Sequence, residues 1–438
     1  MTSVVALLMI SSVSLADENM TQVSQHGVGL DTCTETLDKQ GNLVAIARRH
    51  DGCVLIDVTN PQAPSTIAVI QPDMGTQDIW DVDIHGDYVY LMNRPEAVDS
   101  VLGNWVGLYV YDISTPAPPA LAGYVLWGGG AWHHLAGSVQ AGTVNDINGT
   151  PYAFLCSDIT GNVEVFDMTI PSAPLFVTSI FPQTSFTSAF EVQFLNNKVY
   201  IAWGRGGFSV EDVSNPFAPV NLIDQPYTGQ SVINGGLKTI APTPDGKYVV
   251  TGEYTLQGTI RIWDVQGSAA IQKDTWQLNT GALLWTVRAT NDFAFVAHLE
   301  DGIQVLDIRD KNNVSNVGSF DPDAGNPTTT WSGISDVYID GNRIYSSHQL
   351  DGLYATDFGD SISVLKAEWH RKKKQLTVYA TSSDQPQRTL TLVGFGNMTW
   401  KSRKNLYQLK QRSVTSNPGT ITIESDLIGT ITVPVTTR

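Results

Sequence analysis

The chain alternates apolar and polar residues in short runs, and one phrase recurs along it. The phrase is a glycine, a largely apolar run that ends in aspartate, and a turn. Strict alternation over so few residues is typical of half-buried β-strands. Seven copies occupy residues 52–61, 107–116, 161–171, 207–216, 258–265, 302–310 and 352–360. The distance between successive closing aspartates is 43 to 55 residues, which leaves room for about four short strands in each repeat.

A second pair of strands precedes the phrase, and a further strand follows it. Residues 79–93, 190–203 and 334–348 are two apolar runs joined by short turns such as His85-Gly86-Asp87, the pattern of a β-hairpin. Residues 63–70 and 172–180 supply an outer strand. Four antiparallel strands in seven repeats predict an all-β fold, a seven-bladed β-propeller over residues 17–360. A helical solenoid is excluded by the period, and a parallel β-helix is the main rival.

The aspartate that closes each phrase has a structural explanation. Its carboxylate can accept hydrogen bonds from backbone amides of the turn that follows. Repetition in every blade fits a turn cap better than it fits a single active site. The residues concerned are Asp57, Asp112, Asp167, Asp212, Asp264, Asp307 and Asp357.

The last part of the chain has a different composition and period. Residues 372–383, 388–400, 405–414, 419–429 and 430–435 form alternating runs separated by Asn, Pro and Gly turns. About 75 residues suffice for a small sandwich. We therefore predict a basic, immunoglobulin-like β-sandwich over residues 361–438, similar to the accessory sandwiches that end many bacterial surface proteins.

The first residues have the pattern of an export signal. Val4 to Leu15 is a short apolar stretch, and Ser14-Leu15-Ala16 ends it with small residues. A charged segment before it is missing, and a buried first strand is the alternative. We predict a signal peptide over residues 1–16 and a protein that is secreted or on the cell surface. No apolar run reaches the length of a transmembrane helix, so no transmembrane segment is expected.

Several segments resemble a known family of repeat proteins. They are Ile84-His85-Gly86-Asp87, YVYLMN (88–93), GLYVYDIS (107–114) and NPQAP (60–64). Over residues 30–360 the chain is similar to the LVIVD-repeat proteins, extracellular β-propellers of bacteria and archaea. The resemblance implies a secreted or surface-exposed propeller, generally without an assigned enzymatic activity. It carries no catalytic residue over to this chain.

Charge is unevenly distributed. The formal net charge is −17, which argues against nucleic acid as a partner. Residues 361–438 hold 12 of the 26 Lys and Arg but only 4 of the 43 Asp and Glu. The basic tail and the acidic body are expected to attract each other, within one molecule or between neighbours, so self-association through these surfaces is one possible role. Docking of the tail on an anionic surface is the alternative.

Histidines are the candidates for a metal site. In a propeller, His50, His298 and His348 take matching places just before the glycine of repeats 1, 6 and 7, and ring closure makes those blades neighbours. His133 and His134 open the innermost strand of repeat 3 on the same face. Imidazoles that converge can hold a transition metal. Against this, second strands lie away from the axis, and a polar histidine beside an Asp-Gly turn is ordinary.

Side chains suited to ligand binding are expected on the same face of the predicted propeller. Aromatic rings, acids and arginines together fit a surface glycan, a peptide or a protein ligand. The alternative is that the tryptophans fill the channel and the spaces between blades. The candidates are Trp80, Arg94, Trp132, Glu191, Trp203, Arg205, Glu253 and Trp331, and Trp285 also lies near the start of an innermost strand.

Motifs of enzymes and cofactor sites are missing. The sequence has no GxSxG, HExxH, P-loop or GxGxxG after a strand. Cys33 and Cys53 can form a disulfide after export, whereas Cys156 stays unpaired. Asp321 and Asp323 suggest calcium but lack the later ligands of an EF-hand loop. We expect a binding module, with a metal-dependent hydrolase or oxidase as the first alternative and a structural subunit of a surface assembly as the second.

Overall fold

The computed structural model is an all-β protein. It describes residues 18–28, 33–72, 77–94, 105–127, 139–157, 160–183, 188–227, 236–255, 258–278, 280–323 and 333–438. The helical element in these ranges is one turn of 3₁₀-helix, Ser402–Lys404. None of the described segments is a helix long and apolar enough to cross a membrane. The chain divides into two compact units, the first over residues 22–340 and 344–356 and the second over 18–21, 341–343 and 357–438.

The first unit contains seven four-stranded sheets. Six of them are antiparallel meanders of consecutive strands, as the repeated phrases predict. Their strands are β2 (Leu37–Gln40), β3 (Leu43–Ala47), β4 (Cys53–Asp57) and β5 (Ser65–Ile70); β6 (Ile79–His85), β7 (Tyr88–Asn93), β8 (Trp105–Asp112) and β9 (Ala120–Trp127); β10 (Val139–Ile147), β11 (Thr150–Ser157), β12 (Val163–Asp167) and β13 (Leu175–Ile180); β14 (Glu191–Leu195), β15 (Lys198–Ala202), β16 (Phe208–Asp212) and β17 (Val220–Gln225); β18 (Leu237–Pro242), β19 (Tyr248–Glu253), β20 (Thr259–Asp264) and β21 (Ile271–Gln277); and β22 (Thr286–Ala289), β23 (Phe293–Ala297), β24 (Ile303–Asp307) and β25 (Ser315–Phe320).

The seventh sheet joins the two ends of the unit. Its order is β1-β28-β27-β26, where β26 is Ile334–Asp340, β27 is Arg343–His348 and β28 is Gly352–Phe358. The outer strand is β1 (Met20–His26), from the start of the chain. An outer strand after the last phrase is therefore not formed, because the residues that follow, Ile362–His370, belong to a sheet of the second unit.

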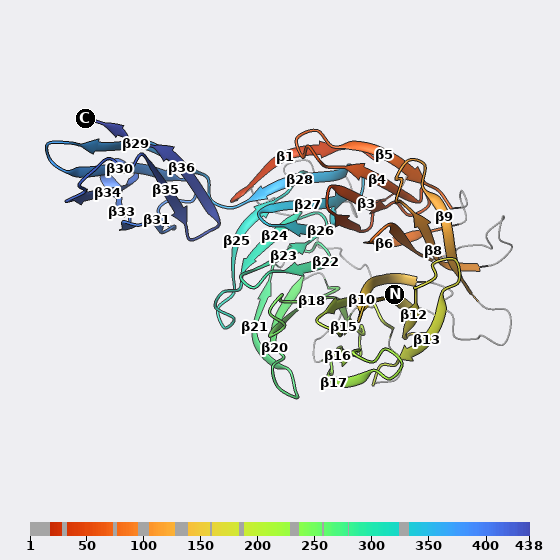
Figure 1. Ribbon diagram of the computed structural model, residues 1–438. Helices are drawn as coiled ribbons and strands as arrows, with labels where there is room; N and C mark the ends of the chain where they lie inside the picture. The colour runs from red at the N-terminus through yellow and green to blue at the C-terminus, as the bar shows by residue number, and fades with distance from the viewer. Residues whose placement is uncertain are drawn as a thin grey trace, which may run out of the picture. The chain divides into compact units, whose positions relative to one another are not determined.

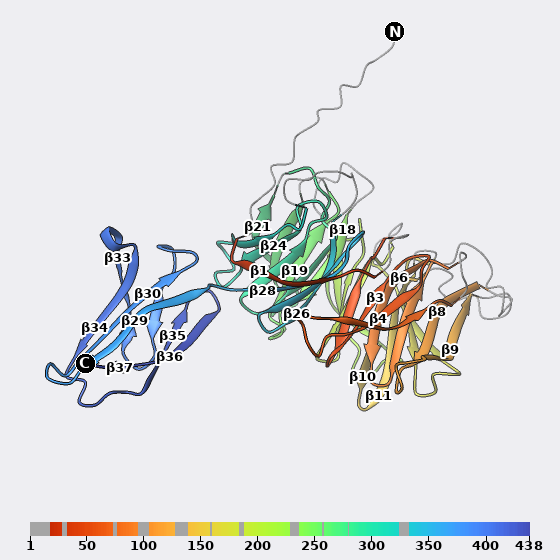
Figure 2. The same ribbon diagram turned by 90° about the horizontal axis from the view of Figure 1, so that it is seen from above.

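The seven sheets follow one another in a cycle. The first strand of each sheet contacts the first strand of the next, from β2 through β6, β10, β14, β18 and β22 to β26, and β26 contacts β2. Figure 1 shows the sheets around a common centre, with the fourth strands on the outside, and Figure 2 shows the same sheets from above.

Side chains on the first strands join neighbouring sheets. A strand at the edge of a sheet leaves backbone groups unpaired, and these need partners when they are buried. Each sheet exchanges at least one such hydrogen bond with the next sheet. The hydrogen bonds run from Ile84 N–H to Asp38 (2.7 Å), Gly142 and Val144 N–H to Asp81 and Asp83 (2.9 and 3.1 Å), Gln140 to Ala189 C=O (2.5 Å), Ile240 N–H to Glu191 (3.0 Å), Val287 N–H to Thr239 (2.9 Å), Thr286 to Ser335 C=O (3.0 Å) and Leu37 N–H to Asp336 (3.3 Å).

Alternate apolar residues pack between adjacent sheets. Leu55 and Cys53 from the first sheet meet Val82, Val89 and Leu91 from the second in one buried cluster. Burial of a leucine such as Leu55 contributes about 1.5–3 kcal/mol to the free energy of folding. The core is thus divided into layers between the sheets.

The prediction of turn caps is confirmed for six of the seven closing aspartates. In each, a carboxylate oxygen accepts the backbone N–H two residues later, at 2.7 to 3.1 Å. The six are Asp57, Asp112, Asp167, Asp212, Asp264 and Asp307. Asp357 instead pairs with Arg343 at 2.5 Å. It is followed by Phe358, Gly359 and the chain's entry into the second unit rather than by a Ser/Thr-x-Pro turn.

The second unit contains a five-stranded and a four-stranded sheet. The first has the order β33-β34-β30-β29-β37 and the second β32-β31-β35-β36. One hydrophobic cluster takes residues from both, among them Leu376 and Val378 from the first and Leu390 and Ile423 from the second. The strands are β29 (Ile362–His370), β30 (Gln375–Ser382), β31 (Leu390–Leu392), β32 (Gly396–Asn397), β33 (Thr399–Lys401), β34 (Leu406–Arg412), β35 (Thr420–Ser425), β36 (Gly429–Pro434) and β37 (Thr436–Thr437).

Candidate functional site

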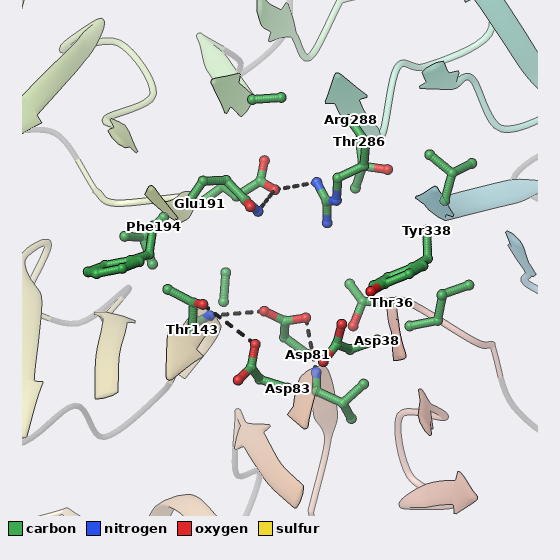
Figure 3. Close-up of a pocket in the computed structure, with 18 of the residues that line it drawn as sticks. Thr36, Asp38, Asp81, Asp83, Thr143, Glu191, Phe194, Thr286, Arg288 and Tyr338 are labelled. Carbon is green, nitrogen blue, oxygen red and sulfur yellow. Dashed lines mark hydrogen bonds and ion pairs between the residues drawn. The ribbon is translucent and has the colours of Figure 1, made fainter. Parts of the chain in front are cut away.

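The first strands of the seven sheets line a cavity of about 400 Å³. Each of β2, β6, β10, β14, β18, β22 and β26 contributes residues to its wall. Figure 3 shows some of these side chains directed into it. The volume lies in the range of small-molecule sites. The charged residues in its lining are Glu35, Asp38, Asp81, Asp83, Glu191, Lys238 and Arg288.

Three aspartates form one side of the cavity, which we name the carboxyl wall: Asp38, Asp81 and Asp83 (Figure 3). All three accept backbone N–H groups of the next sheet. Among the described residues, none of them has a Lys or Arg partner within ion-pair distance. Burial raises the pKa of Asp81 to about 7 and also raises the pKa of Asp38. Burial and the charge of Asp38 hold the pKa of Asp83 well above its ordinary value.

Arg288 forms the opposite side with two acidic partners. Its guanidinium lies 2.6 Å from Glu191 Oε1 and 3.1 Å from Asp336 Oδ1. Burial alone would lower the pKa of Arg288, but the charges of Asp336 and Glu191 raise it. Burial likewise raises the pKa of Asp336, although Arg288 opposes the shift. Arg288 is thus already engaged by two carboxyl groups and offers little to an anionic ligand.

Two charged residues of the lining, Glu35 and Lys238, are only partly paired among the described residues. Glu35 is 2% exposed; its Oε1 pairs with Arg49 at 2.9 Å, whereas its Oε2 accepts no hydrogen bond. Lys238 lies over the ring of Trp285, 4.1 Å from the centroid, and has no ion pair in the described part of the chain. Burial raises the pKa of Glu35 and lowers that of Lys238.

Trp80 and Glu191 are the residues of the predicted ligand-binding set that line this cavity. The guanidinium groups of Arg49 and Arg94 both lie 4.2 Å from the Trp80 ring. The Trp80 indole N–H donates to Asp78 at 2.7 Å. Arg94 thus contacts the ring without reaching the cavity wall.

The other members of that set lie elsewhere. Trp203 is 1% exposed and belongs to a hydrophobic cluster, and its indole N–H donates to Ser209 at 2.8 Å. Arg205 is exposed. Glu253 is buried, pairs with Arg261 and accepts the Tyr227 hydroxyl at 3.1 Å. Trp132 and Trp331 lie outside the described residues.

The three described histidines of the predicted metal set each have a local partner. His50 Nδ1 lies 3.3 Å from the Gln77 carbonyl oxygen. His298 is fully buried, with Nδ1 2.9 Å from Asp301 Oδ2 and Nε2 against Gly258, where a Cβ would lie 1.9 Å away. His348 Nε2 lies 2.9 Å from Asp323 Oδ2. His133 and His134 are outside the described residues.

One group in the described part of the chain has the composition of a metal site. It consists of Asp323, His348 and Asp351, which offer ligand atoms within 4.8 Å of one another. His348 Nδ1 accepts the backbone N–H groups of Leu350 and Asp351, at 3.3 and 3.1 Å. This leaves the proton on Nε2, which donates it to Asp323. A metal bound at Nε2 requires that proton on Nδ1 instead, where the two N–H donors oppose it.

The remaining cofactor and disulfide candidates are resolved by local contacts. Cys33, Cys53 and Cys156 are all free thiols, so the Cys33–Cys53 disulfide is not formed. Asp321 Oδ1 accepts the N–H of Asp323, whose side chain contacts His348 rather than Asp321.

Most of the cavity lining was not expected from the sequence. Asp38, Asp81, Asp83, Lys238 and Arg288 were not named because single charged residues in a strand resemble an exposed face. A signal was present in IWDVDIH (79–85), where acids alternate with apolar residues on a strand expected to lie innermost. Polar residues at alternate positions of an innermost strand face the axis rather than solvent.

Comparison with known proteins gives a family and two structural likenesses. The model of the LVIVD repeat matches residues 100–126, 188–222 and 285–322. The structure titled "Structure of U3-55K" has a TM-score of 0.56 at 10% identity, over 78% of this chain and all of that one. The computationally designed Ika8 protein has a TM-score of 0.49 at 11% identity, with the same coverage. The comparison with curated proteins finds no match. The chain thus carries LVIVD repeats at three places, in an all-β architecture.

Proposed function

We propose that the first unit is a seven-bladed β-propeller that works as a secreted or surface-exposed binding module for a small ligand. The cyclic order of contacts between the first strands of the seven sheets supports the propeller. The apolar stretch from Val4 to Leu15 supports export. Two sheets that share one hydrophobic cluster support an immunoglobulin-like sandwich at the end of the chain.

One observation carries the binding function: the cavity of about 400 Å³ between the seven first strands. Its volume lies in the range of small-molecule sites, and it is open to solvent, so that a ligand can enter. Glu35 lines it, and the buried Glu35 Oε2 has no hydrogen-bond donor among the described residues. Leaving a buried acceptor unpaired costs about 1–3 kcal/mol, a cost that a ligand with the matching donor removes.

The experiment uses defined small molecules and a variant with the cavity filled. Thr143 lies on β10 and lines the cavity, and Thr143→Trp adds bulk there. Ligand-observed NMR is run with putrescine, maltose and succinate as probes of three classes. The proposal expects at least one probe to bind the native protein and to lose binding in Thr143→Trp.

Surface binding of a probe is separated by the same pair of proteins. Equal binding to the native protein and to Thr143→Trp places that probe outside the cavity and counts against the proposal. Asp224→Asn is the matched control, because Asp224 is exposed on the outer strand β17. Thermal unfolding of each variant checks that the fold is retained.

A further inference from the structure

We infer that the cavity binds an organic cation with a primary ammonium group, held by the carboxyl wall. This inference rests on the proposed function and names the chemical class of its ligand. Two independent observations carry it: three aspartates that face the cavity without a cation, and a buried glutamate in the cavity wall with one oxygen that lacks a donor.

The carboxyl wall offers acceptors without a matching positive charge. Asp38, Asp81 and Asp83 use backbone N–H groups of the next sheet as donors, and no Lys or Arg of the described residues pairs with them. A carboxylate has about four lone-pair sites, so each aspartate keeps acceptor capacity toward the cavity. An ammonium group supplies three donors and the missing charge.

Glu35 is the second observation. It is 2% exposed and lines the same cavity, and its Oε2 has no hydrogen-bond donor. Its other oxygen is held by Arg49, so the carboxylate cannot turn freely to find one. A second ammonium or amine group on the ligand would supply that donor.

A bare metal ion does not fit these groups. Among the described residues, one group of three Asp, Glu, His or Cys side chains has its ligand atoms within 4.8 Å of one another. That group is Asp323, His348 and Asp351, and none of the three lines the cavity. Asp38, Asp81 and Asp83 are therefore too dispersed to converge on one ion. An elongated cation reaches separated carboxylates.

Neutral sugars and anions fit less well. The faces of Trp80 and Trp285, on which a sugar ring would stack, already carry Arg49, Arg94 and Lys238. The lining has five acids against Lys238 and Arg288, and Arg288 is already paired with Glu191 and Asp336. The excess of acidic over basic groups favours a cation, whose charge stabilises their ionised form.

Binding of a cation has a consequence for protons. The carboxyls of the wall hold protons to a higher pH than free aspartates do, because burial opposes their charge. A bound ammonium favours the ionised form, so these groups release protons when it binds. A neutral ligand would not produce this release.

Isothermal titration calorimetry with putrescine tests the inference near pH 6.5. Titrations in two buffers of different ionisation enthalpy give the number of protons released, and the diol of the same chain length is the neutral control. We expect putrescine to bind with proton release and the diol not to bind. Asp81→Asn with Asp83→Asn should raise the Kd at least about tenfold, whereas Asp224→Asn should leave it unchanged.

Three outcomes overturn the inference. Absence of putrescine binding overturns it, and so does a Kd unaffected by the double variant or binding without proton release. Asp38→Asn replaces the double variant if the latter fails to fold. Maltose or succinate bound in the cavity and lost in Thr143→Trp, with putrescine unbound, would refute the cation and keep the binding function. If none of the three probes binds in the cavity, both the cation and the binding function are refuted.

Discussion

The carboxylate of Asp336 accepts the backbone N–H of Leu37 at 3.3 Å, across 299 positions of sequence. Asp336 lies on the first strand of the last sheet and Leu37 on that of the first sheet. The bond therefore joins the two ends of the cycle at its inner edge. The same aspartate holds Arg288, so one side chain takes part both in closing the ring and in the charge balance of the cavity.

Replacement of Asp336 should be strongly destabilising. Asp336→Ala removes a fully buried partner and leaves Arg288 with Glu191 alone. Breaking a buried ion pair costs about 3–5 kcal/mol, and we expect a loss of that order in the free energy of unfolding. Urea denaturation measures it. Arg309→Ala, which breaks a pair with 38% of the arginine side chain exposed, should cost less than about 1 kcal/mol. Equal losses would contradict the structural role.

The stability contributed by Asp81 should depend on pH. Burial raises its pKa to about 7 in the folded protein, from 3.8. The folded state therefore binds the proton more tightly, so the contribution is fully present below about pH 3.8 and is lost as the pH rises through about 7. Asp81→Asn removes this titration. The unfolding free energy of the native protein relative to the variant should fall between about pH 5 and about pH 8.

Asp57 provides the matched control for this pH series. Hydrogen bonds from Thr59 lower its pKa below the ordinary value of 3.8. Its contribution is present above about that value and is lost only as the pH falls through the lowered pKa. The difference between the native protein and Asp57→Asn should be flat over the same range. A flat result for Asp81→Asn as well would show that its pKa is not raised.

Loss of a single turn cap should have a modest effect. Asp167 accepts the N–H of Thr169 at 2.8 Å. Asp167→Ala removes one hydrogen bond at the end of β12, and we expect a loss of about 1 kcal/mol in the free energy of unfolding. Asp224→Ala, which removes an exposed acid without a cap, should change it by less than about 0.5 kcal/mol. Thermal unfolding of the two variants side by side checks the difference.

Removal of β1 should damage the fold far more than removal of the residues before it. Deletion through His26 takes away the outer strand of the seventh sheet and exposes the edge of β28. We expect a lower melting temperature and association through that edge, measured by calorimetry and size-exclusion chromatography. Deletion of residues 1–16 alone should change neither property. A monomer of unchanged melting temperature without β1 would show that the strand is dispensable.

His348 is expected to bind no transition metal. Its Nδ1 accepts two backbone N–H groups, which keeps the proton on Nε2. Elemental mass spectrometry of protein purified without a histidine tag should find metal well below one equivalent. A stoichiometric metal that disappears in His348→Gln would overturn this assignment of the tautomer.

The repeated phrase made the sheets predictable because its period is local. Glycine before the strand, alternation inside it and aspartate at its end are all encoded within about ten residues, and the turn caps at Asp57 through Asp307 follow directly. The outer strand of the last sheet was not predictable in this way. Met20–His26 pairs with β28, and nothing in either segment specifies a partner more than 300 residues away.

The cavity was only partly predictable for a similar reason. Trp80 and Glu191 were found because each stands at the start of an innermost strand. Trp203 follows a second strand and was expected on the same face of the propeller, but it is buried between sheets. Whether a side chain at such a position faces the axis or a neighbouring sheet depends on the register of strands from different repeats.

The pairing of β1 with β28 also sets the order of events during biosynthesis. The strand made first has its partner made last, so the ring cannot be completed until the chain has been synthesised to about Phe358. Until then the growing chain exposes the inner edges of its first and latest sheets, which are prone to associate. A chain whose synthesis stops before Gly352 would therefore keep β1 without its partner strand.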